Sequence, residues 1–328
     1  MGNAVQAVLA ILIGVGGIIA LFWILNAVVE RLPKRQEERL KPYVFVGPSL
    51  AVVGLFLLYP AVLTVWFSFQ TRVGTPDQEF TLDNYVYLFT DSRLHSALIN
   101  NLLWIIVVPS VAVAIGLLVA VLSDRLKPTS EKIAKSLIFL PMAVSFVGAS
   151  TIWLFIYAWR PPEVEQFGLL AALASVVGDP PSTPILQISD FRLNSFALMA
   201  VVIWMQAGFA MVLLSAAIKG VPMDTIEAAR IDGATEFQIF FKVVIPQIAS
   251  TIVVVLTTIL ILVLKIFDIV RVTTNGRGNT QVIANYFYTF FEGGNYGRAG
   301  VVVILLVLMT FPFMIINVKR FREQEAQR

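Results

Sequence analysis

The side chains best able to do chemistry gather in one polar run, Glu227-Ala228-Ala229-Arg230-Ile231-Asp232-Gly233-Ala234, after which an apolar stretch ends at Ile245-Pro246. The surrounding residues are mostly apolar, so the charges of this run predict a surface that docks against a partner. The chain has no cysteine and one histidine, His95, which excludes thiol catalysis, disulfides and clustered zinc ligands. No metal site is expected at His95, because the sequence shows no partner ligand near it.

Two short helices joined at Gly233 are expected over residues 219–246. Pro222 suits the first turn of a helix, where its missing N–H is not needed, and Gly233 can take the left-handed conformation that ends one. Thr235 followed by Gln238 fits a capping box that opens the second helix. An apolar stripe on the second helix is expected from Phe237, Phe240, Phe241 and Val244. An ordinary amphipathic connector on the membrane surface explains the same pattern equally well.

The composition places the rest of the chain in a membrane. The 328 residues are 58% hydrophobic and 14% charged, whereas soluble domains are about 45–50% apolar and about 25% charged. Too few charges remain to cover a water-soluble surface, so one polytopic membrane domain with lipid around it is expected. The net charge of +3 comes from dispersed basic residues, which excludes nucleic acid as an expected partner.

Seven segments are long and apolar enough to cross a bilayer, which takes about 20 apolar residues for a helix. The expected spans are 4–29, 43–69, 97–122, 136–158, 195–218, 247–267 and 298–318. The first lacks a basic n-region and is too long for a signal peptide, so a retained helix is predicted. The expected fold class is therefore an all-α integral membrane protein with about seven transmembrane helices.

Lysine and arginine positions predict the orientation. Of the 24 lysines and arginines, 16 fall in the segments 30–42, 123–135 and 219–246 and in the C-terminal tail, and 8 fall in the alternate loops and span ends. Because these residues are enriched on the cytoplasmic side, the loop 219–246 and the C-terminus are predicted in the cytoplasm and the N-terminus outside. The outward segment 159–194 holds five prolines and is expected to be an ordered loop.

The polar run resembles the EAA loop of ABC importer permease subunits. That pattern has Gly six residues after Glu, as Gly233 follows Glu227, and it usually closes on Leu-Pro where this chain has Ile245-Pro246. Further matches are Leu82-Asp83-Asn84-Tyr85 with Phe89, Phe139-Leu140-Pro141, Trp204, Gly208, and Phe267-Asp268 followed by Thr274-Asn275-Gly276. The resemblance covers roughly residues 43–322 and is greatest to the first permease subunit of the carbohydrate branch, including maltose, glycerol-3-phosphate and α-glucoside systems.

The resemblance implies a type I ABC importer permease fold and a division of the chain into three parts. These are an extra transmembrane helix with a basic cytoplasmic linker at 1–42, a permease domain at 43–322 that contains the EAA loop 219–246, and a cytoplasmic tail at 323–328. The implied location is the inner membrane of a bacterium or archaeon. The implied cargo is a sugar, with an α-glucoside or another oligosaccharide as the first expectation.

The implied partners are a second permease subunit in a heterodimer, a pair of ATPase subunits, and a periplasmic or lipid-anchored solute-binding protein. The sequence contains no Gly-x-x-x-x-Gly-Lys-[Ser/Thr] phosphate loop. ATP and Mg²⁺ would therefore be bound by the separate ATPase, and no cofactor and no enzymatic activity are expected in this chain.

The resemblance also implies two sets of functional residues. The set expected to couple to the ATPase is Glu227, Ala228, Ala229, Asp232, Gly233 and Ala234. The set expected to line the substrate path is Met205, Gln206 and Phe209, which share a face of span 195–218 with Val202, and Ile266, which shares a face of span 247–267 with Ile259, Leu262 and Val263. Ordinary helix packing explains the second set equally well, and capping of its own helix is the alternative for Glu227.

Two other classes of function remain as alternatives. An ion-driven secondary transporter is expected to carry ionisable residues inside its spans and often repeated halves, but the predicted spans are almost free of charge and show no repeat. A membrane-embedded enzyme needs a nucleophile with its base, or metal ligands, at membrane depth, and a chain with one histidine and no cysteine offers few candidates.

Overall fold

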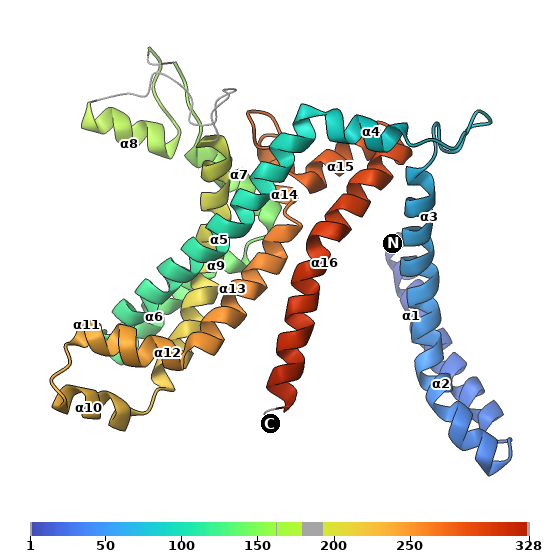
Figure 1. The fold of residues 1–328 in the computed structure, drawn as a ribbon, viewed down its shortest axis with the longest axis horizontal. Coiled ribbons are helices and arrows are strands. Elements are labelled where there is room, and N and C mark those ends of the chain that lie inside the picture. The colour runs from blue at the N-terminus through green and yellow to red at the C-terminus, as the bar shows by residue number, and fades with distance from the viewer. Residues whose placement is uncertain (1, 162, 179–192, 327–328) are drawn as a thin grey trace. The chain divides into compact units, whose positions relative to one another are not determined.

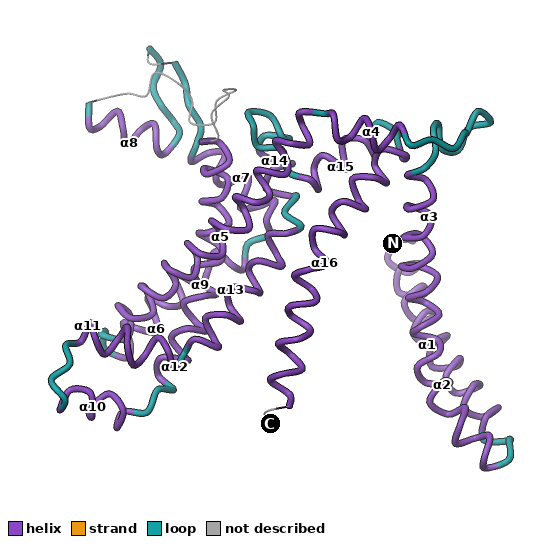
Figure 2. Tube along the Cα trace, in the orientation of Figure 1, coloured by secondary structure: helices purple, strands orange, loops and turns teal. Residues whose placement is uncertain are grey.

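The computed structural model describes residues 2–161, 163–178 and 193–326, and its helices follow the predicted spans (Figure 1). Five described helices are long and apolar enough to cross a membrane, and two bent helix pairs bring the number to seven when each pair counts as one span. Helices make up most of the described chain, and Figure 2 shows no strand among those residues. The expectation of an all-α membrane protein with about seven spans is confirmed.

The elements in chain order, with η1 and η3 single stretches of π-helix and η2 a 3₁₀ turn, are α1 (Gly2–Val29), α2 (Lys34–Val53), η1 (Gly54–Leu58), α3 (Tyr59–Ser68), α4 (Asp83–Thr90), α5 (Ser92–Asp124), α6 (Pro128–Phe139), η2 (Leu140–Ala143), α7 (Phe146–Ile156), α8 (Leu169–Val177), α9 (Leu193–Lys219), α10 (Met223–Ile231), α11 (Glu236–Ile239), η3 (Phe240–Val244), α12 (Ile245–Gln247), α13 (Ala249–Leu264), α14 (Asp268–Thr273), α15 (Ile283–Glu292) and α16 (Tyr296–Ala326).

The first compact unit, Met1–Phe67, is a hairpin of apolar helices. The helix that begins at Lys34 runs without a break to Ser68, so it starts nine residues before the predicted span 43–69. The mostly charged residues 34–41 form the first turns of this helix, because Lys, Arg, Glu and Gln are good helix formers. Most described apolar side chains of the unit are exposed, as expected of helices covered by lipid. The sequence predicts a domain boundary at residue 42, whereas this compact unit ends at Phe67. The boundary at residue 42 stays a prediction.

The second unit, Ser68–Arg328, is built around α5 and α9, which pack against each other along their lengths. Its core holds Trp104 and Val108 of α5, Met211 of α9 and Ile259 of α13. A Cβ added at Gly116 of α5 would lie 2.5 Å from the Ala210 Cβ and 2.8 Å from the Met211 nitrogen. Small residues let membrane helices approach closely in this way.

Replacing Gly116 with valine is expected to loosen the contact between α5 and α9. The added side chain meets the backbone of α9, which cannot rotate away, and overpacking a helix contact costs about 1–3 kcal/mol. The melting temperature of the detergent-solubilised protein should fall. Gly14→Val in α1 is the matched control, because a Cβ at Gly14 has no neighbour within 4 Å. An unchanged melting temperature for Gly116→Val would show that the two helices are not in close contact.

The predicted span 136–158 is not one straight helix, which corrects the expectation. Its first half is formed by α6 and η2, which begin earlier than predicted, at Pro128. The axis of this half is bent by 104° relative to α7. Pro141 lies in the turn η2 and lacks an amide donor to continue α6. Ser145 then starts α7, because its Oγ accepts a hydrogen bond from the Gly148 backbone nitrogen at 3.1 Å. The break therefore follows from local chemistry at two positions.

The expected loop 159–194 contains a short helix, α8, in its described part. Residues 162 and 179–192, including four of the five prolines that suggested a loop, lie outside the described residues. Gly178 ends α8 with a φ of +99°, a left-handed conformation that glycine adopts without strain.

Candidate functional site

Helix α10 ends in a Schellman motif at Gly233, at one end of the second unit (Figure 1). Gly233 has a φ of +81°, which confirms the predicted left-handed conformation. The Ala234 backbone nitrogen donates to the Ala229 oxygen at 3.0 Å, and the Gly233 nitrogen donates to the Arg230 oxygen, also at 3.0 Å. These two hydrogen bonds satisfy the last carbonyl groups of the helix and fix the direction in which the chain leaves it.

The second helix of the loop opens with the predicted capping box. The Thr235 Oγ1 accepts from the Gln238 backbone nitrogen at 3.3 Å, and the Gln238 Oε1 accepts from the Thr235 backbone nitrogen at 2.8 Å. The helix continues through η3 and α12 to Gln247 and then bends by 68° into α13. The two-helix loop expected at 219–246 is confirmed, and its second helix leads directly into a membrane span.

An apolar cluster joins the two helices of the loop on their inner side. Val221, Ile239, Val244 and Ile248 are buried there, and Ala229 and Ala234 are half-buried against them. The remaining members of the predicted coupling set are exposed: Glu227, Ala228, Asp232 and Gly233. The six residues therefore divide into two that hold the loop together and four that are open to a partner.

The predicted apolar stripe on the second helix contains both buried and exposed side chains. Val244 is buried and Phe240 half-buried, but Phe237 is 72% exposed and Phe241 is also exposed. Residues Phe240–Val244 form a π-helical stretch, which the sequence pattern does not predict. The Phe237 and Phe241 ring centroids lie 4.5 Å apart and form an apolar area on the outside of the loop.

Sequence reasoning missed a further exposed residue of α10. Ile231 is 87% exposed beside Asp232, although it is a large aliphatic residue. Its position gave a usable signal, since it lies five residues after the inward-facing Ile226 and so points roughly 140° away on a helix. A single exposed aliphatic side chain is common on protein surfaces, so Ile231 is of interest only together with the exposed Glu227 and Asp232 on the same loop.

A group of charged side chains holds the base of the loop to the helix bundle. The Lys219 Nζ at the end of α9 lies 2.6 Å from the Glu131 Oε1 of α6 and 3.3 Å from the Asp124 Oδ1 at the end of α5. Lys135 pairs with the same Glu131 and also donates to Ser215. Three helices are thereby joined at the point where the loop 219–246 begins, so the loop starts from a fixed base.

The predicted substrate-path residues lie in the core of this one chain. Met205, Gln206 and Ile266 are buried and Phe209 is half-buried, and all but Gln206 belong to or pack against one apolar cluster. Helix α13 ends at Leu264, so Ile266 lies beyond the helix and does not share a helical face with the other residues of that set, which corrects the expectation. Whether these residues line a path stays a prediction.

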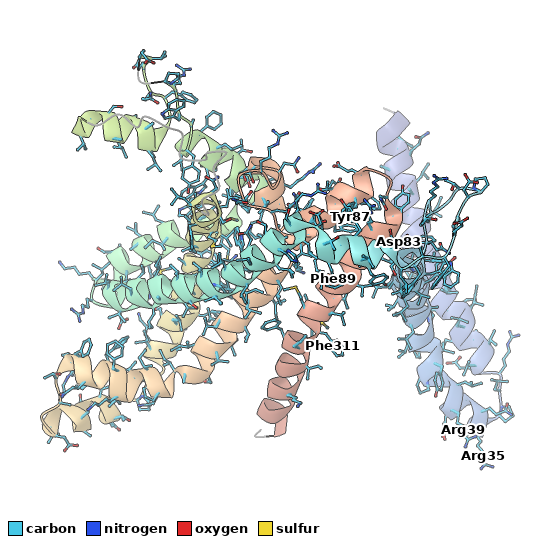
Figure 3. The ribbon with its side chains drawn as sticks, turned by 45° about the horizontal axis from the view of Figure 1, so that its top comes forward. Arg35, Arg39, Asp83, Tyr87, Phe89 and Phe311 are labelled. Carbon is cyan, nitrogen blue, oxygen red and sulfur yellow. The ribbon has the colours of Figure 1, made fainter. Side chains whose placement is uncertain are left out.

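The opposite end of the second unit is held together by Asp91. Its carboxylate accepts hydrogen bonds from the Arg93 Nη2 at 2.8 Å and from the Tyr286 hydroxyl at 2.7 Å. Burial acts to raise the pKa of Asp91, but the hydrogen bonds outweigh it and hold the pKa at about 2. Tyr87 of α4, seen in Figure 3, accepts from the same Arg93 and lies under the Arg298 guanidinium, 3.5 Å from its ring centroid. The ionised carboxylate thus joins α5 to α15, and Tyr87 of α4 links Arg93 to Arg298 of α16.

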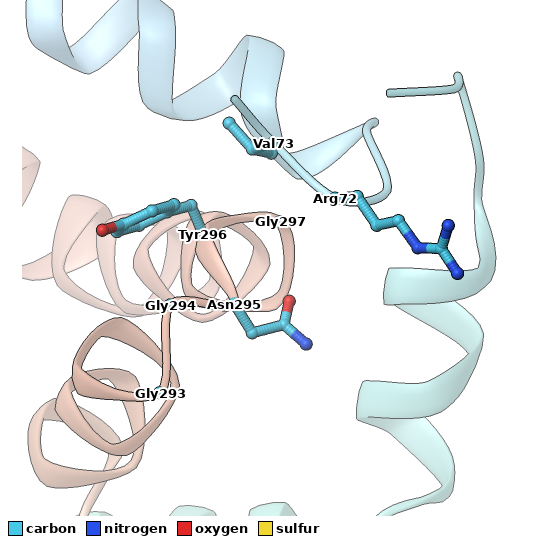
Figure 4. A pocket seen from close by; sticks show the side chains of 7 residues that line it. All are labelled: Arg72, Val73, Gly293, Gly294, Asn295, Tyr296 and Gly297. Carbon is cyan, nitrogen blue, oxygen red and sulfur yellow. The ribbon is translucent and has the colours of Figure 1, made fainter. Parts of the chain in front are cut away.

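A small hollow lies at this same end. It has a volume of about 250 Å³ and is lined by Arg72, Val73, Gly293, Gly294, Asn295, Tyr296 and Gly297 (Figure 4). Pockets for small ligands measure about 300–1,000 Å³, so no sugar site is assigned to it. The described residues also contain no group of three or more His, Cys, Asp or Glu side chains that could hold a metal ion.

The chain is similar in sequence to several known proteins. The family model described as "Binding-protein-dependent transport system inner membrane component" matches residues 93–319. The osmoprotective compounds uptake permease protein GgtC of Synechocystis sp. is 47% identical over 285 residues, which are 87% of this chain and 100% of GgtC. The alpha-glucoside transport system permease protein AglF of Rhizobium meliloti is 42% identical over 335 residues, 97% of each chain.

A solved structure shares the fold. One chain of a bacterial ABC transporter involved in the import of the acidic polysaccharide alginate superposes with a TM-score of 0.72. The match covers 88% of this chain and 99% of that chain. At 21% identity, this likeness supports the arrangement of the helices and nothing about cargo.

Proposed function

The chain belongs to the family of binding-protein-dependent transport system inner membrane components, and from that premise we propose that its cargo is an α-glucoside or a related oligosaccharide. The chain is a multi-pass inner-membrane permease subunit of a sugar ABC importer, a transporter and not a catalytic enzyme. The choice of cargo is supported by AglF, whose name gives alpha-glucoside transport, at 42% identity over nearly the whole chain.

The proposal assigns ATP hydrolysis, with its Mg²⁺, to a separate pair of ATPase subunits that dock on the loop 219–246. The observation that carries it is the exposed helix α10, which presents Glu227 and Ile231 and ends at the left-handed Gly233. A charged group beside exposed aliphatic surface suits a protein partner, because hydrophobic contact gives affinity and charge gives orientation. The second helix then leads from the docking surface into α13.

The remaining partners and the orientation are part of the same proposal. A second permease subunit would complete the path, and a periplasmic or lipid-anchored binding protein would deliver the sugar on the side opposite the loop. The distribution of lysine and arginine supports a cytoplasmic loop and C-terminus with the N-terminus outside. In agreement with this, the C-terminal end of α16 lies at the same end of the second unit as α10 (Figure 1).

The substrate path is the least direct part of the proposal. Met205, Gln206, Phe209 and Ile266 would meet the sugar only where transport opens the core that now covers them. A core of this apolar character would hold a sugar weakly, because sugar hydroxyls find few partners there. Selection of the cargo would then be made largely by the binding protein.

Uptake by the reconstituted transporter tests the function. Proteoliposomes that contain this chain, its second permease and its ATPase should accumulate radiolabelled maltose or trehalose when the binding protein is outside and ATP is on the ATPase side. Omitting ATP or the binding protein should reduce uptake to the level of empty liposomes. Uptake that persists without the ATPase and follows an ion gradient would instead support the secondary-transporter alternative.

A further inference from the structure

An ion pair crosses the turn between the two helices of the loop 219–246. The Arg230 Nε donates to the Glu236 Oε1 at 2.8 Å, and the Arg230 Nη2 donates to the Glu236 Oε2 at 3.3 Å. Arg230 belongs to the last turn of α10 and Glu236 to the first turn of α11. The two residues are six apart with Gly233 between them, so this pair does not stabilise either helix internally and instead connects the two.

The geometry of the pair suits the control of an angle. A guanidinium that makes two parallel hydrogen bonds to one carboxylate fixes direction as well as distance. The inner side of the two helices is held by the apolar cluster that contains Ala229 and Ala234, and the pair holds the outer side. With one contact on each side of the left-handed Gly233, α10 is restrained from rotating about that residue.

The Arg230–Glu236 pair is exposed to solvent. The side chains of Arg230 and Glu236 are 48% and 68% exposed. Exposed ion pairs contribute little to stability, so removing this one should leave both helices folded. The hydrogen bonds and charge of Glu236 raise the pKa of Arg230 above its usual range.

We propose that Arg230 and Glu236 are positioning residues that fix the angle between α10 and the helix leading into α13, so that movement of a docked α10 reaches the membrane spans. The inference rests on the proposed function, because it assumes that an ATPase moves α10. Without the pair, α10 would still dock, but its movement would be absorbed at Gly233. The quantity that the pair controls is therefore the amount of sugar transported per ATP hydrolysed.

Charge reversal and charge exchange in the reconstituted transporter test this proposal. Arg230→Glu and Glu236→Arg each place like charges across the turn, and we expect each to reduce sugar transported per ATP by roughly three- to tenfold. The double variant, Arg230→Glu with Glu236→Arg, restores opposite charges and should recover most of that loss. Arg230→Lys keeps the charge but loses the two-bond geometry, so an intermediate loss is expected.

A matched control is available in α2, where Lys41 and Glu37 form an ion pair at 3.0 Å within one helix. Lys41→Glu breaks a comparable pair that crosses no turn, and its transport per ATP should equal that of the native chain. Should charge reversal prevent the protein from accumulating, Arg230→Gln and Glu236→Gln give the same comparison without repulsion.

Co-purification of the ATPase separates the possible outcomes. If the native chain binds no ATPase, the proposed function fails before the pair is tested. If ATPase binding is normal and both single variants transport as the native chain does, the positioning role is wrong. If Arg230→Glu alone loses the ATPase and the double variant does not regain it, Arg230 contacts the partner directly and the proposal is again overturned.

Discussion

Replacing Glu227 with arginine should strip the ATPase from the solubilised transporter and abolish ATP-driven uptake. Glu227 is exposed on α10, the helix proposed to enter the partner. Removing one member of a buried, hydrogen-bonded charge pair costs about 2–5 kcal/mol, and reversal adds repulsion. That loss corresponds to binding weaker by roughly 30- to 4,000-fold, enough to lose the ATPase during purification.

The alternative role of Glu227, capping its own helix, makes a different prediction. Among the described residues no side chain caps the N-terminus of α10, and Glu227 lies in its second turn. A capping residue could be replaced by glutamine or arginine at a cost of about 1 kcal/mol to the helix alone. Docking instead predicts that Glu227→Gln weakens ATPase binding and that Glu227→Arg removes it.

Pull-down of the ATPase with the tagged chain measures this effect. The control is Glu38→Arg, which makes the same change of charge at an exposed position of α2. The control should retain the ATPase at the native level. Equal retention by Glu38→Arg and Glu227→Arg would remove Glu227 from the docking surface, while loss of the ATPase from both would point to a general effect of net charge.

The features that the sequence predicts well are those set by residues close together in the chain. Gly233 ends α10 in the left-handed conformation, and Thr235 with Gln238 closes the capping box, because each needs only a short stretch of backbone. The spans are equally predictable, since membrane helices satisfy their own hydrogen bonds and need only length and apolarity. Their existence is more predictable than their ends.

The features that the sequence misses depend on geometry established only after folding. The stretch Phe240–Val244 is π-helical, and no residue propensity marks such a stretch in the sequence. The pairing of Arg230 with Glu236 needs the exact path of the turn between them. The spacing of Ile266 predicts a place on a helical face, but the helix ends two residues earlier. Periodicity assigns a face only while the helix continues.

The residues predicted to line the substrate path are buried or half-buried by packing within this chain. Helical spacing places Met205 and Phe209 on one face of α9, and the structure supports that grouping. Spacing cannot tell whether such a face meets a neighbouring helix of the same chain, a second subunit or a sugar. In this chain α5 and α13 pack against α9, so the apolar pattern is explained by packing within the subunit before any ligand is considered.

Replacing Gly233 with valine should uncouple ATP hydrolysis from transport while the ATPase remains bound. Gly233 has a φ of +81°, and a Cβ there would have no neighbour within 4 Å. A substitution therefore causes no clash, and its whole effect comes from the backbone conformation. Left-handed conformation costs non-glycine residues roughly 1–2 kcal/mol, with β-branched residues the least tolerant. Sugar transported per ATP should fall by about five- to thirtyfold for valine.

A series at this position separates conformation from size. Asparagine enters the left-handed region far more readily than alanine or valine does, although it is larger than alanine. Transport per ATP should therefore decrease in the order Gly, Asn, Ala, Val, and ATPase binding should stay constant because Glu227 and Ile231 are unchanged. A decrease that follows side-chain volume, with alanine above asparagine, would show that the partner packs against Gly233. Native transport by Gly233→Val would show that the turn need not stay left-handed for coupling.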